Sequence, residues 1–227
     1  MNTVLITGTN RGIGLAFTSR YLARGDRVIA CCRHPDTAPE LQALAHDALR
    51  IEALDVSDAA SREALADRLA DEQVDLFINN AGIYGSGQQL DEVEEAEWQR
   101  VFSVNVIAPL LLTRALLPRL SVKPPARLVY LSSKMGSIAD NSGGGTYIYR
   151  SSKTALNQVV KSLAIDLELR GMAVAALHPG WVRTDMGGPN GLIDADTSVS
   201  GLMTVIDGLD ATGSGRFYNY DGQEIPW

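Results

Sequence analysis

The chain has 227 residues, of which 45% are hydrophobic and 21% charged, a composition typical of a globular protein large enough to bury a substantial core. Its formal net charge of -7 disfavours nucleic acid as a partner, because an acidic surface repels a phosphate backbone. The longest apolar segment, residues 101–117, is interrupted by Asn105, Pro109 and Arg114, so it predicts a buried helix and no membrane span.

Short apolar runs alternate with helical patterns along the chain. The expected strands are 3–7, 27–32, 49–53, 74–79, 127–132, 173–177 and 216–220. The expected helices are 12–24, 39–46, 59–70, 94–120, 146–170 and 197–207. This alternation predicts an α/β protein with a doubly wound Rossmann fold, in which residues 1–227 form one domain and helices cover both faces of a parallel seven-stranded sheet.

The two cysteines, Cys31 and Cys32, are adjacent in an expected strand. Neighbouring side chains of a strand point to opposite faces of the sheet, so we expect two free thiols and no disulfide between them. Free thiols are typical of a reducing compartment, and the N-terminus has no signal-peptide pattern. We therefore expect a cytoplasmic protein.

A glycine-rich turn joins the first strand to the first helix. It reads Thr7-Gly8-Thr9-Asn10-Arg11-Gly12-Ile13-Gly14. Glycines let the backbone approach a pyrophosphate closely, and a helix N-terminus supplies free N–H groups and a positive dipole. A purely structural turn is the alternative, but the strand before it and the helix after it favour a dinucleotide site.

Tyr149 and Lys153 stand four residues apart at the start of a long expected helix, so both lie on one helical face. A free tyrosine has a pKa near about 10, and we expect the neighbouring ammonium to lower the pKa of Tyr149. Tyr149 would then exchange a proton with a carbonyl or alcohol oxygen. A chance pair on an exposed helix is the alternative, which the upstream glycine turn disfavours. We expect Tyr147 in the pocket wall and Lys134 at the pocket edge.

The glycine spacing, G-x-x-x-G-x-G, resembles that of the short-chain dehydrogenases/reductases, and further motifs of that family follow in family order. They are Leu54-Asp55-Val56, Asn79-Asn80-Ala81-Gly82, Tyr149 with Lys153, and Pro179-Gly180-Trp181-Val182-Arg183-Thr184. The resemblance implies a nicotinamide dinucleotide, whose adenine Asp55 would bind and whose carboxamide Thr184 would bind. The residues expected at this cofactor are Gly8, Asn10, Arg11, Gly12, Ile13, Gly14, Arg33, Asp55, Val56, Asn80, Ala81, Gly82, Tyr149, Lys153, Pro179, Gly180, Val182 and Thr184.

The same resemblance implies two further catalytic residues beside Tyr149 and Lys153. The family's catalytic serine is the second of a pair, which is Ser133 here, and its hydroxyl would orient the substrate oxygen. Ser132 stays open as the alternative, because the gap to Tyr149 is longer than the family's usual one. Asn105 matches the family's helical asparagine, which holds a water that links the lysine to solvent.

The end of the second expected strand predicts NADP in preference to NAD. Members of the family that are specific for NAD have an acidic residue there, whereas this chain has the neutral Cys32. Arg33 follows directly, and Arg11 in the glycine turn is a second cation placed to bind a 2′-phosphate. Two ordinary surface arginines are the alternative.

Residues 131–138 and 215–222 resemble the branch of the family that includes C-factor, sniffer and carbonyl reductases. The resemblance implies a small carbonyl or alcohol substrate, and the short segment after Thr184 implies loose specificity. A dinucleotide-binding signalling or sensor protein of the C-factor type is the alternative. An epimerase or dehydratase is disfavoured by the glycine spacing and the short C-terminal part. The three histidines have no metal-ligand spacing, so no metal is expected.

The apolar stripe on the expected helix 146–170 is wider than one seam against a sheet requires. Its members are Ala155, Leu156, Val159, Val160, Leu163, Ala164 and Leu167. The excess predicts a homo-oligomer, most simply a dimer. A helix that is merely well buried is the alternative.

Overall fold

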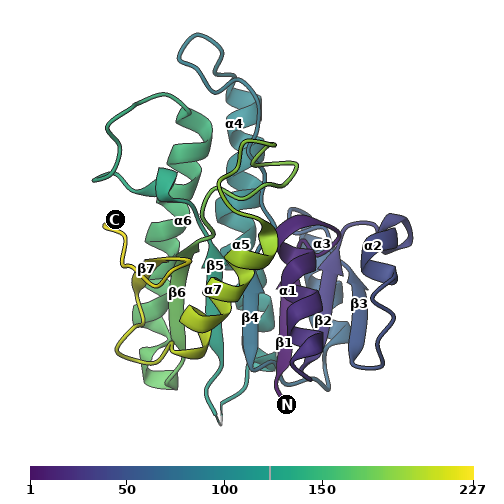
Figure 1. Ribbon diagram of the computed structural model, residues 1–227. Coiled ribbons are helices and arrows are strands. Elements are labelled where there is room, and N and C mark those ends of the chain that lie inside the picture. Colours follow the sequence, from purple (N-terminus) through teal and green to yellow (C-terminus); the bar gives the residue numbers. More distant parts are fainter. Residues whose placement is uncertain (123) are drawn as a thin grey trace.

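Within residues 1–122 and 124–227, which the computed structural model describes, seven strands form one sheet in the order β3-β2-β1-β4-β5-β6-β7 (Figure 1). The strands are β1 (Thr3–Thr7), β2 (Arg27–Cys32), β3 (Leu49–Ala53), β4 (Leu76–Asn79), β5 (Arg127–Leu131), β6 (Ala173–His178) and β7 (Arg216–Asn219). Every neighbouring pair is parallel. The order runs outward in opposite directions from β1 and β4, so the doubly wound fold expected from the sequence is confirmed.

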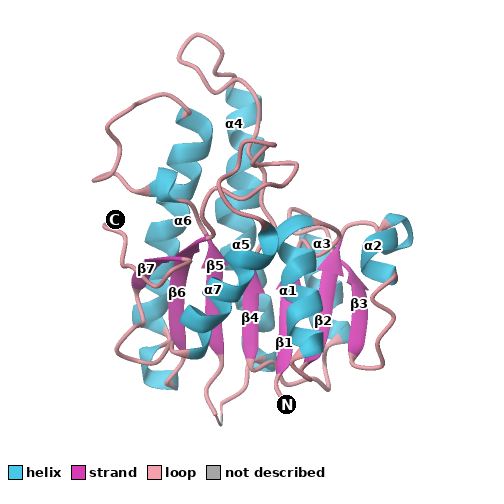
Figure 2. Cartoon of the chain, in the orientation of Figure 1, coloured by secondary structure: helices cyan, strands magenta, loops and turns pink. Residues whose placement is uncertain are grey.

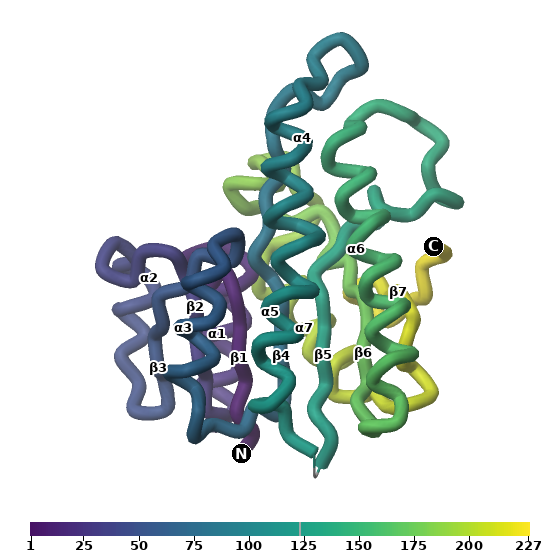
Figure 3. The backbone as a smooth tube through the Cα atoms, turned by 180° about the vertical axis from the view of Figure 1, so that it is seen from behind, coloured from purple at the N-terminus to yellow at the C-terminus, as the bar shows by residue number. Residues whose placement is uncertain are grey.

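Helices cover both faces of the sheet, as Figure 2 shows. On one face lie α1 (Gly12–Ala23), α2 (Pro39–Gln42) and α7 (Ala195–Asp207). On the other face, which is turned toward the viewer in Figure 3, lie α3 (Ala59–Arg68), α4 (Glu95–Phe102), α5 (Ala108–Leu116) and α6 (Tyr147–Asp166). Single turns of 3₁₀ helix are η1 (Pro35–Thr37), η3 (Leu117–Arg119), η4 (Lys134–Gly136) and η5 (Glu168–Arg170), and η2 (Ser103–Ile107) is a π-helical turn.

Two hydrophobic cores lie on the two faces of the sheet, because alternate side chains of each strand point to opposite faces. On β1, Leu5 belongs to the core under α3, α5 and α6, whereas Ile6 belongs to the core under α1 and α7. Cys31 and Cys32 divide between the two cores in the same way. Both of these described thiols are buried and free, which confirms the expectation.

The expected single helix 94–120 is interrupted by a π-helical turn, η2, between α4 and α5. Pro109 lies in the first turn of α5, and proline has no N–H to donate to the carbonyl four residues before it, at Asn105. A wider turn replaces the missing α-helical bond there. The expectation of one regular helix was therefore wrong, and the irregular turn contains Asn105 itself.

By length and composition alone, the continuous helical stretch Glu95–Arg119 could cross a membrane. The side chains of Leu112 and Leu116 in that stretch are 0% exposed and belong to the same core as Leu128 of β5. A core helix packed on a sheet meets the same length and composition test, and the contacts of this stretch are those of a core helix.

Several expected elements are shorter in the structure, among them the second helix and the fourth strand. The second helix ends at Gln42, because Ala45 adopts a positive φ of 24° that a helix does not contain. The fourth strand begins at Leu76, because Val74 pairs with Leu120 only as an isolated bridge.

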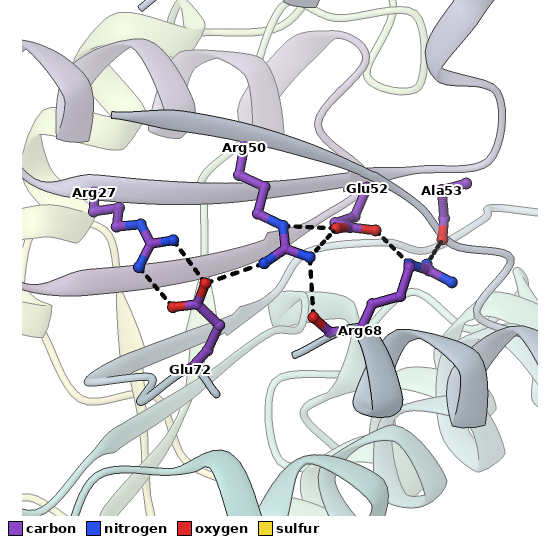
Figure 4. A network of polar contacts seen from close by, with 6 residues as sticks. All are labelled: Arg27, Arg50, Glu52, Ala53, Arg68 and Glu72. Atoms are coloured by element: carbon purple, nitrogen blue, oxygen red, sulfur yellow. Dashed lines mark hydrogen bonds and ion pairs between the residues drawn. The ribbon is translucent and has the colours of Figure 1, made fainter. Parts of the chain in front are cut away.

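An ion-pair network holds α3 on the edge strand β3 (Figure 4). Glu72, just after α3, accepts two hydrogen bonds of 2.6 Å from Arg27 and one of 3.0 Å from Arg50. Glu52 of β3 accepts from Arg50 at 2.7 Å and from Arg68 of α3 at 2.6 Å. The network fixes the strand that precedes the expected adenine-binding segment.

Candidate active site

The expected site residues gather at the carboxyl ends of β1, β4, β5 and β6, around the point where the strand order reverses. In open α/β sheets this edge carries the ligand crevice, because loops diverge there and leave a cleft between them.

The glycine turn between β1 and α1 has the shape of a phosphate cradle. Gly8 and Gly12 adopt φ values of 71° and 57°, which favour glycine. A Cβ atom on Gly14 would lie 2.1 Å from the carbonyl oxygen of Gly8, so no larger residue fits there. Among the described residues, no side chain caps the N-terminus of α1, and its first N–H groups therefore remain available to an anion. These features fit a dinucleotide pyrophosphate.

Asn80 locks the end of β4 to this turn. Its Nδ2 donates to the carbonyl oxygens of Thr7 at 2.9 Å and Gly8 at 3.0 Å. The Thr7 hydroxyl in turn accepts from the backbone N–H groups of Asn80 and Ala81, both at 3.0 Å. The Asn80-Ala81 pair therefore holds the glycine turn in place.

Tyr149 and Lys153 are both buried, with exposed fractions of 8% and 5%. The Lys153 ammonium lies 5.7 Å from the centre of the Tyr149 ring and donates to the backbone oxygen of Leu131 at 2.8 Å. A Cβ atom on Gly82 would lie 3.5 Å from that ammonium and 3.3 Å from Asn105 Oδ1. The glycine thus leaves room beside the lysine.

The two serines that end β5 have different partners. Ser132 donates to Asn157 Oδ1 of α6 at 2.6 Å, which ties β5 to the helix. The Ser133 side chain instead lies beside the Tyr149 phenol, where it favours the ionised form, and its hydroxyl accepts from the N–H of Met135 at 3.2 Å. This geometry favours Ser133 over Ser132 as the serine that faces a substrate.

Asn105 is 1% exposed and uses both ends of its amide within the chain. Oδ1 accepts from the N–H of Ile83 at 2.9 Å, and Nδ2 donates to the Ile83 oxygen at 2.8 Å and to Ser152 Oγ at 3.0 Å. The side chain therefore connects the segment after β4 to α6. Its expected role with a bound water stays a prediction.

A cavity of about 650 Å³ opens beside Tyr149 and Ser133. The predicted residues among those that line it are Ile13, Ser133, Tyr149, Pro179, Gly180, Val182 and Thr184. Lys134 also lines it, as expected for the pocket edge. Ser132, the open alternative to Ser133, lines it too. The remaining lining residues, which the sequence interpretation did not assign to it, are Tyr84, Met135, His178, Trp181, Met186 and Gly187.

Residues 2–192 match the family described as short chain dehydrogenase. The chain belongs to this family. It is 46% identical over 164 residues to the C-signal of Myxococcus xanthus, a match that spans 72% of this chain and 99% of that protein.

Two solved carbonyl reductases are similar to this short-chain dehydrogenase over its whole length. The carbonyl reductase Sniffer of Drosophila melanogaster superimposes with a TM-score of 0.96 at 34% identity and covers 100% of both chains. The NADPH-bound carbonyl reductase from chicken fatty liver superimposes with a TM-score of 0.93 at 38% identity and covers 100% of this chain and 99% of its own. The protein is thus an oxidoreductase of the carbonyl-reductase-like branch of the family.

The two arginines expected at a 2′-phosphate, Arg11 and Arg33, are both exposed. Arg11 pairs with Asp185 at 3.1 Å, and both side chains are largely exposed. The pKa of Asp55 is lowered, mainly by the Ser57 hydroxyl, which donates to the carboxylate at 2.6 Å. The positive charge of the exposed Arg33 lowers it further. The role of both arginines at a 2′-phosphate stays a prediction.

Two further residues expected at the cofactor, Asn10 and Val56, differ in their exposure. Asn10 is exposed, whereas Val56 is 9% exposed and packs in the core under α3. The Asp55 Oδ1 atom also accepts from the N–H of Ser57 at 2.9 Å, so this carboxylate shapes its own turn.

Burial has the largest effect on the pKa values of Tyr149 and Lys153. Desolvation raises the pKa of Tyr149 to about 12, against an opposing effect of the Ser133 side chain. Desolvation also lowers the pKa of Lys153 to about 8. The expected lowering of the tyrosine pKa by Lys153 is therefore wrong for the protein alone, because the ammonium is aimed at the Leu131 oxygen and not at the phenol oxygen.

Tyr84 lines the cavity, whereas Tyr147, which was expected in the pocket wall, is 40% exposed and is not among the lining residues. The Tyr84 ring lies 4.7 Å from the Tyr149 ring, centre to centre. His178 lines the cavity at the end of β6, and burial lowers its pKa to about 4, so the imidazole is neutral at pH 7. Its position at a strand end was the one signal in the sequence that pointed to the site.

Burial of the Lys153 ammonium is expected to destabilise the folded protein. Because its pKa falls from 10.5 to about 8, folding with a charged Lys153 costs about 3 kcal/mol below pH 8. Lys153→Met removes that cost and loses a hydrogen bond worth about 1 kcal/mol. We expect the variant to be more stable than the wild type by about 1–3 kcal/mol at pH 7. Urea unfolding measures this difference.

The stability advantage of Lys153→Met over the wild type is expected to decrease as the pH rises above 8. Between pH 8 and 10.5 the lysine is neutral when folded but still charged when unfolded, so the wild type gains stability and the advantage of the variant shrinks. Lys161→Met is the control, because Lys161 is an exposed lysine on the same helix that also donates to a backbone oxygen. A Lys153→Met protein less stable than the wild type by the same amount at pH 7 and pH 10 would contradict the burial argument.

Proposed function

We propose that this short-chain dehydrogenase is an NADP-dependent carbonyl reductase, which transfers a hydride between nicotinamide and a carbonyl or alcohol carbon with Tyr149 as the general acid or base. The observation that carries the proposal is the buried Tyr149 phenol, which lies with Ser133 at the wall of a cavity large enough for a small substrate. The cradle formed by Gly8, Gly12 and Gly14 supports a dinucleotide beside that cavity.

The chain's own residues suit reduction at neutral pH. When bound, the reduced cofactor supplies the hydride. Because burial raises the pKa of Tyr149 to about 12, the phenol is protonated at pH 7, which is the form that donates a proton to a carbonyl oxygen. Ser133 orients that oxygen, and Lys153 is placed to bind the nicotinamide ribose. The reverse reaction needs the phenolate, so we expect alcohol oxidation to be favoured at higher pH.

The cavity wall favours apolar carbonyl compounds. Tyr84, Trp181 and Met186 line it and are 38%, 51% and 52% exposed, so they form an open apolar rim. Such a rim can accept aldehydes and ketones of different shapes, which supports loose specificity.

Tyr149→Phe removes the proposed proton donor without touching a phosphate contact. We expect turnover of carbonyl substrates to fall more than about 100-fold, the range typical of a lost general acid, while the dissociation constant for NADPH changes less than about threefold. Turnover is measured by the loss of NADPH absorbance with a panel of aldehydes and ketones. Tyr147→Phe, two residues away and exposed, is the control and should keep full activity. Retention of a tenth of the wild-type turnover by Tyr149→Phe would show that another group supplies the proton.

The end of β2 supports NADP over NAD. Cys32 is neutral and 3% exposed, and Arg33 stands exposed directly after it. A charged hydrogen bond contributes about 1.5–3 kcal/mol, so we expect Arg33→Ala to weaken NADPH binding at least tenfold and to leave NADH binding unchanged. Calorimetry on both cofactors tests this, with the exposed Arg170→Ala as control. Equal wild-type affinities for the two cofactors would defeat the preference.

A dinucleotide-binding signalling protein is the second candidate, favoured by the 46% identity to C-signal. The two functions differ in turnover. A wild-type protein that binds NADPH tightly but oxidises it with none of the carbonyls would support the signalling candidate.

We also propose a homodimer, although the apolar stripe on α6 leaves fewer side chains free to contact a partner than expected. The stripe residues already buried within one chain are Leu156, Val160, Leu163, Ala164 and Leu167. The apolar side chains left exposed on the same face of the sheet include Ile107, Leu110 and Ile165. We expect a sedimentation mass of twice 24.4 kDa at micromolar concentration. A mass near 24.4 kDa would contradict a dimer.

A further inference from the structure

The helix that carries Tyr149 and Lys153 begins at Tyr147 without a cap from its own segment. Three successive residues before it, Gly144, Gly145 and Thr146, have φ values of 62°, 60° and 52°. A left-handed threonine is strained, and in the described part of the chain no side chain caps the helix from the Thr146 position. The first-turn N–H groups must therefore find their acceptors elsewhere.

Gln88, far away in the sequence, supplies two of these acceptors. Its backbone oxygen accepts from the N–H of Tyr147 at 3.2 Å. Its side-chain Oε1 accepts from the N–H of Tyr149 itself, also at 3.2 Å. Gln88 is 8% exposed, so water does not readily replace it. The backbone of the proposed proton donor is thus held by one glutamine amide.

The other end of the same amide reaches the ring beside Tyr149. Gln88 Nε2 donates to the backbone oxygen of Tyr84 at 2.9 Å. The Tyr84 ring packs on the Tyr149 ring with 4.7 Å between centres and 37° between planes. One side chain therefore fixes both the backbone of the catalytic tyrosine and the residue on which its ring rests.

The loop that presents Gln88 is itself anchored. A Cβ atom on Gly85 would lie 2.6 Å from Val101 of α4, and one on Gly87 would lie 2.4 Å from the Glu92 oxygen, so the path of the loop requires glycine. The N–H of Ser86 also donates to a glutamate of α4 at 2.9 Å. The loop that presents Gln88 is thus held against α4 by the residues just before Gln88.

We propose that Gln88 is a positioning residue that sets the place of the Tyr149 hydroxyl through the N-terminus of α6. It touches no reacting atom. The proposal rests on the proposed function in one respect, which is that Tyr149 donates the proton. A small misplacement of that hydroxyl lowers kcat, because proton transfer requires hydrogen-bond distance, whereas the cofactor contacts of the glycine turn do not change.

The test compares three glutamine variants. Gln88→Met has a similar length but loses the acceptor for Tyr149 and the donor for Tyr84. Gln88→Glu keeps an acceptor at the helix N-terminus, where a carboxylate is favourable. Gln89→Met makes the same chemical change at the exposed neighbouring residue and is the matched control.

The first readout is amide hydrogen exchange at Tyr149 in the protein without cofactor. We expect exchange to be at least tenfold faster in Gln88→Met, close to the wild-type rate in Gln88→Glu, and unchanged in Gln89→Met. If Gln88→Met does not fold, Gln88→Asn, whose shorter amide does not span the gap, carries the same expectation. An unchanged Tyr149 exchange rate in the folded variant would overturn the proposal.

The second readout is steady-state kinetics. We expect Gln88→Met to lower kcat about tenfold with the KM for NADPH unchanged, and Gln88→Glu to restore most of kcat. Faster exchange with an unchanged kcat would also overturn the positioning role. A wild-type protein without turnover on any carbonyl overturns the proposed function instead, while the exchange rates still decide whether Gln88 holds the helix.

Discussion

The burial of Lys153 beside Tyr149 is the constraint on which the rest of the site depends. An ammonium in the protein interior needs a hydrogen-bond acceptor. Lys153 donates to the backbone oxygen of Leu131 at the end of β5. Gly82 leaves space for it, and Asn105 ties the neighbouring segment to α6. The parallel sheet brings these elements together, because the carboxyl ends of its strands meet at one edge.

Burial also decides the chemistry that the protein has before any ligand binds. It raises the pKa of Tyr149 to about 12 and lowers that of Lys153 to about 8, so both groups are driven toward their neutral forms. The chain alone therefore holds a protonated phenol, ready to act as an acid. A positive charge brought by an oxidised nicotinamide would act in the opposite direction, which makes the direction of the reaction depend on the bound cofactor.

Much of the fold could be predicted because its signals are local. Strand lengths and helix starts followed from short apolar runs and from the glycine turn at residues 8–14. The positions of Tyr149 and Lys153 also followed from spacing, since four residues on a helix share a face. The π-helical turn at Asn105 was missed, because the effect of Pro109 on a buried helix depends on how that helix packs.

What could not be predicted consists of contacts between distant segments and of the degree of burial. The hydrogen bond from Tyr149 to Gln88 and the packing of Tyr84 join parts of the chain that no spacing rule relates. Arg11 was expected at a phosphate, but the sequence offers no measure of its competing pair with Asp185. The direction of the Tyr149 pKa shift required knowing how fully the phenol is buried.

Burial, and not Lys153, governs the pKa of the Tyr149 phenol in the protein without cofactor. Ultraviolet difference titration measures it directly, when the spectrum of a protein with phenylalanine at that position is subtracted from that of the wild type without cofactor. We expect the tyrosinate signal of Tyr149 to be absent at pH 10 and to develop only toward a pKa of about 12. A Tyr149 signal that titrates at or below pH 10 in the absence of cofactor would contradict it.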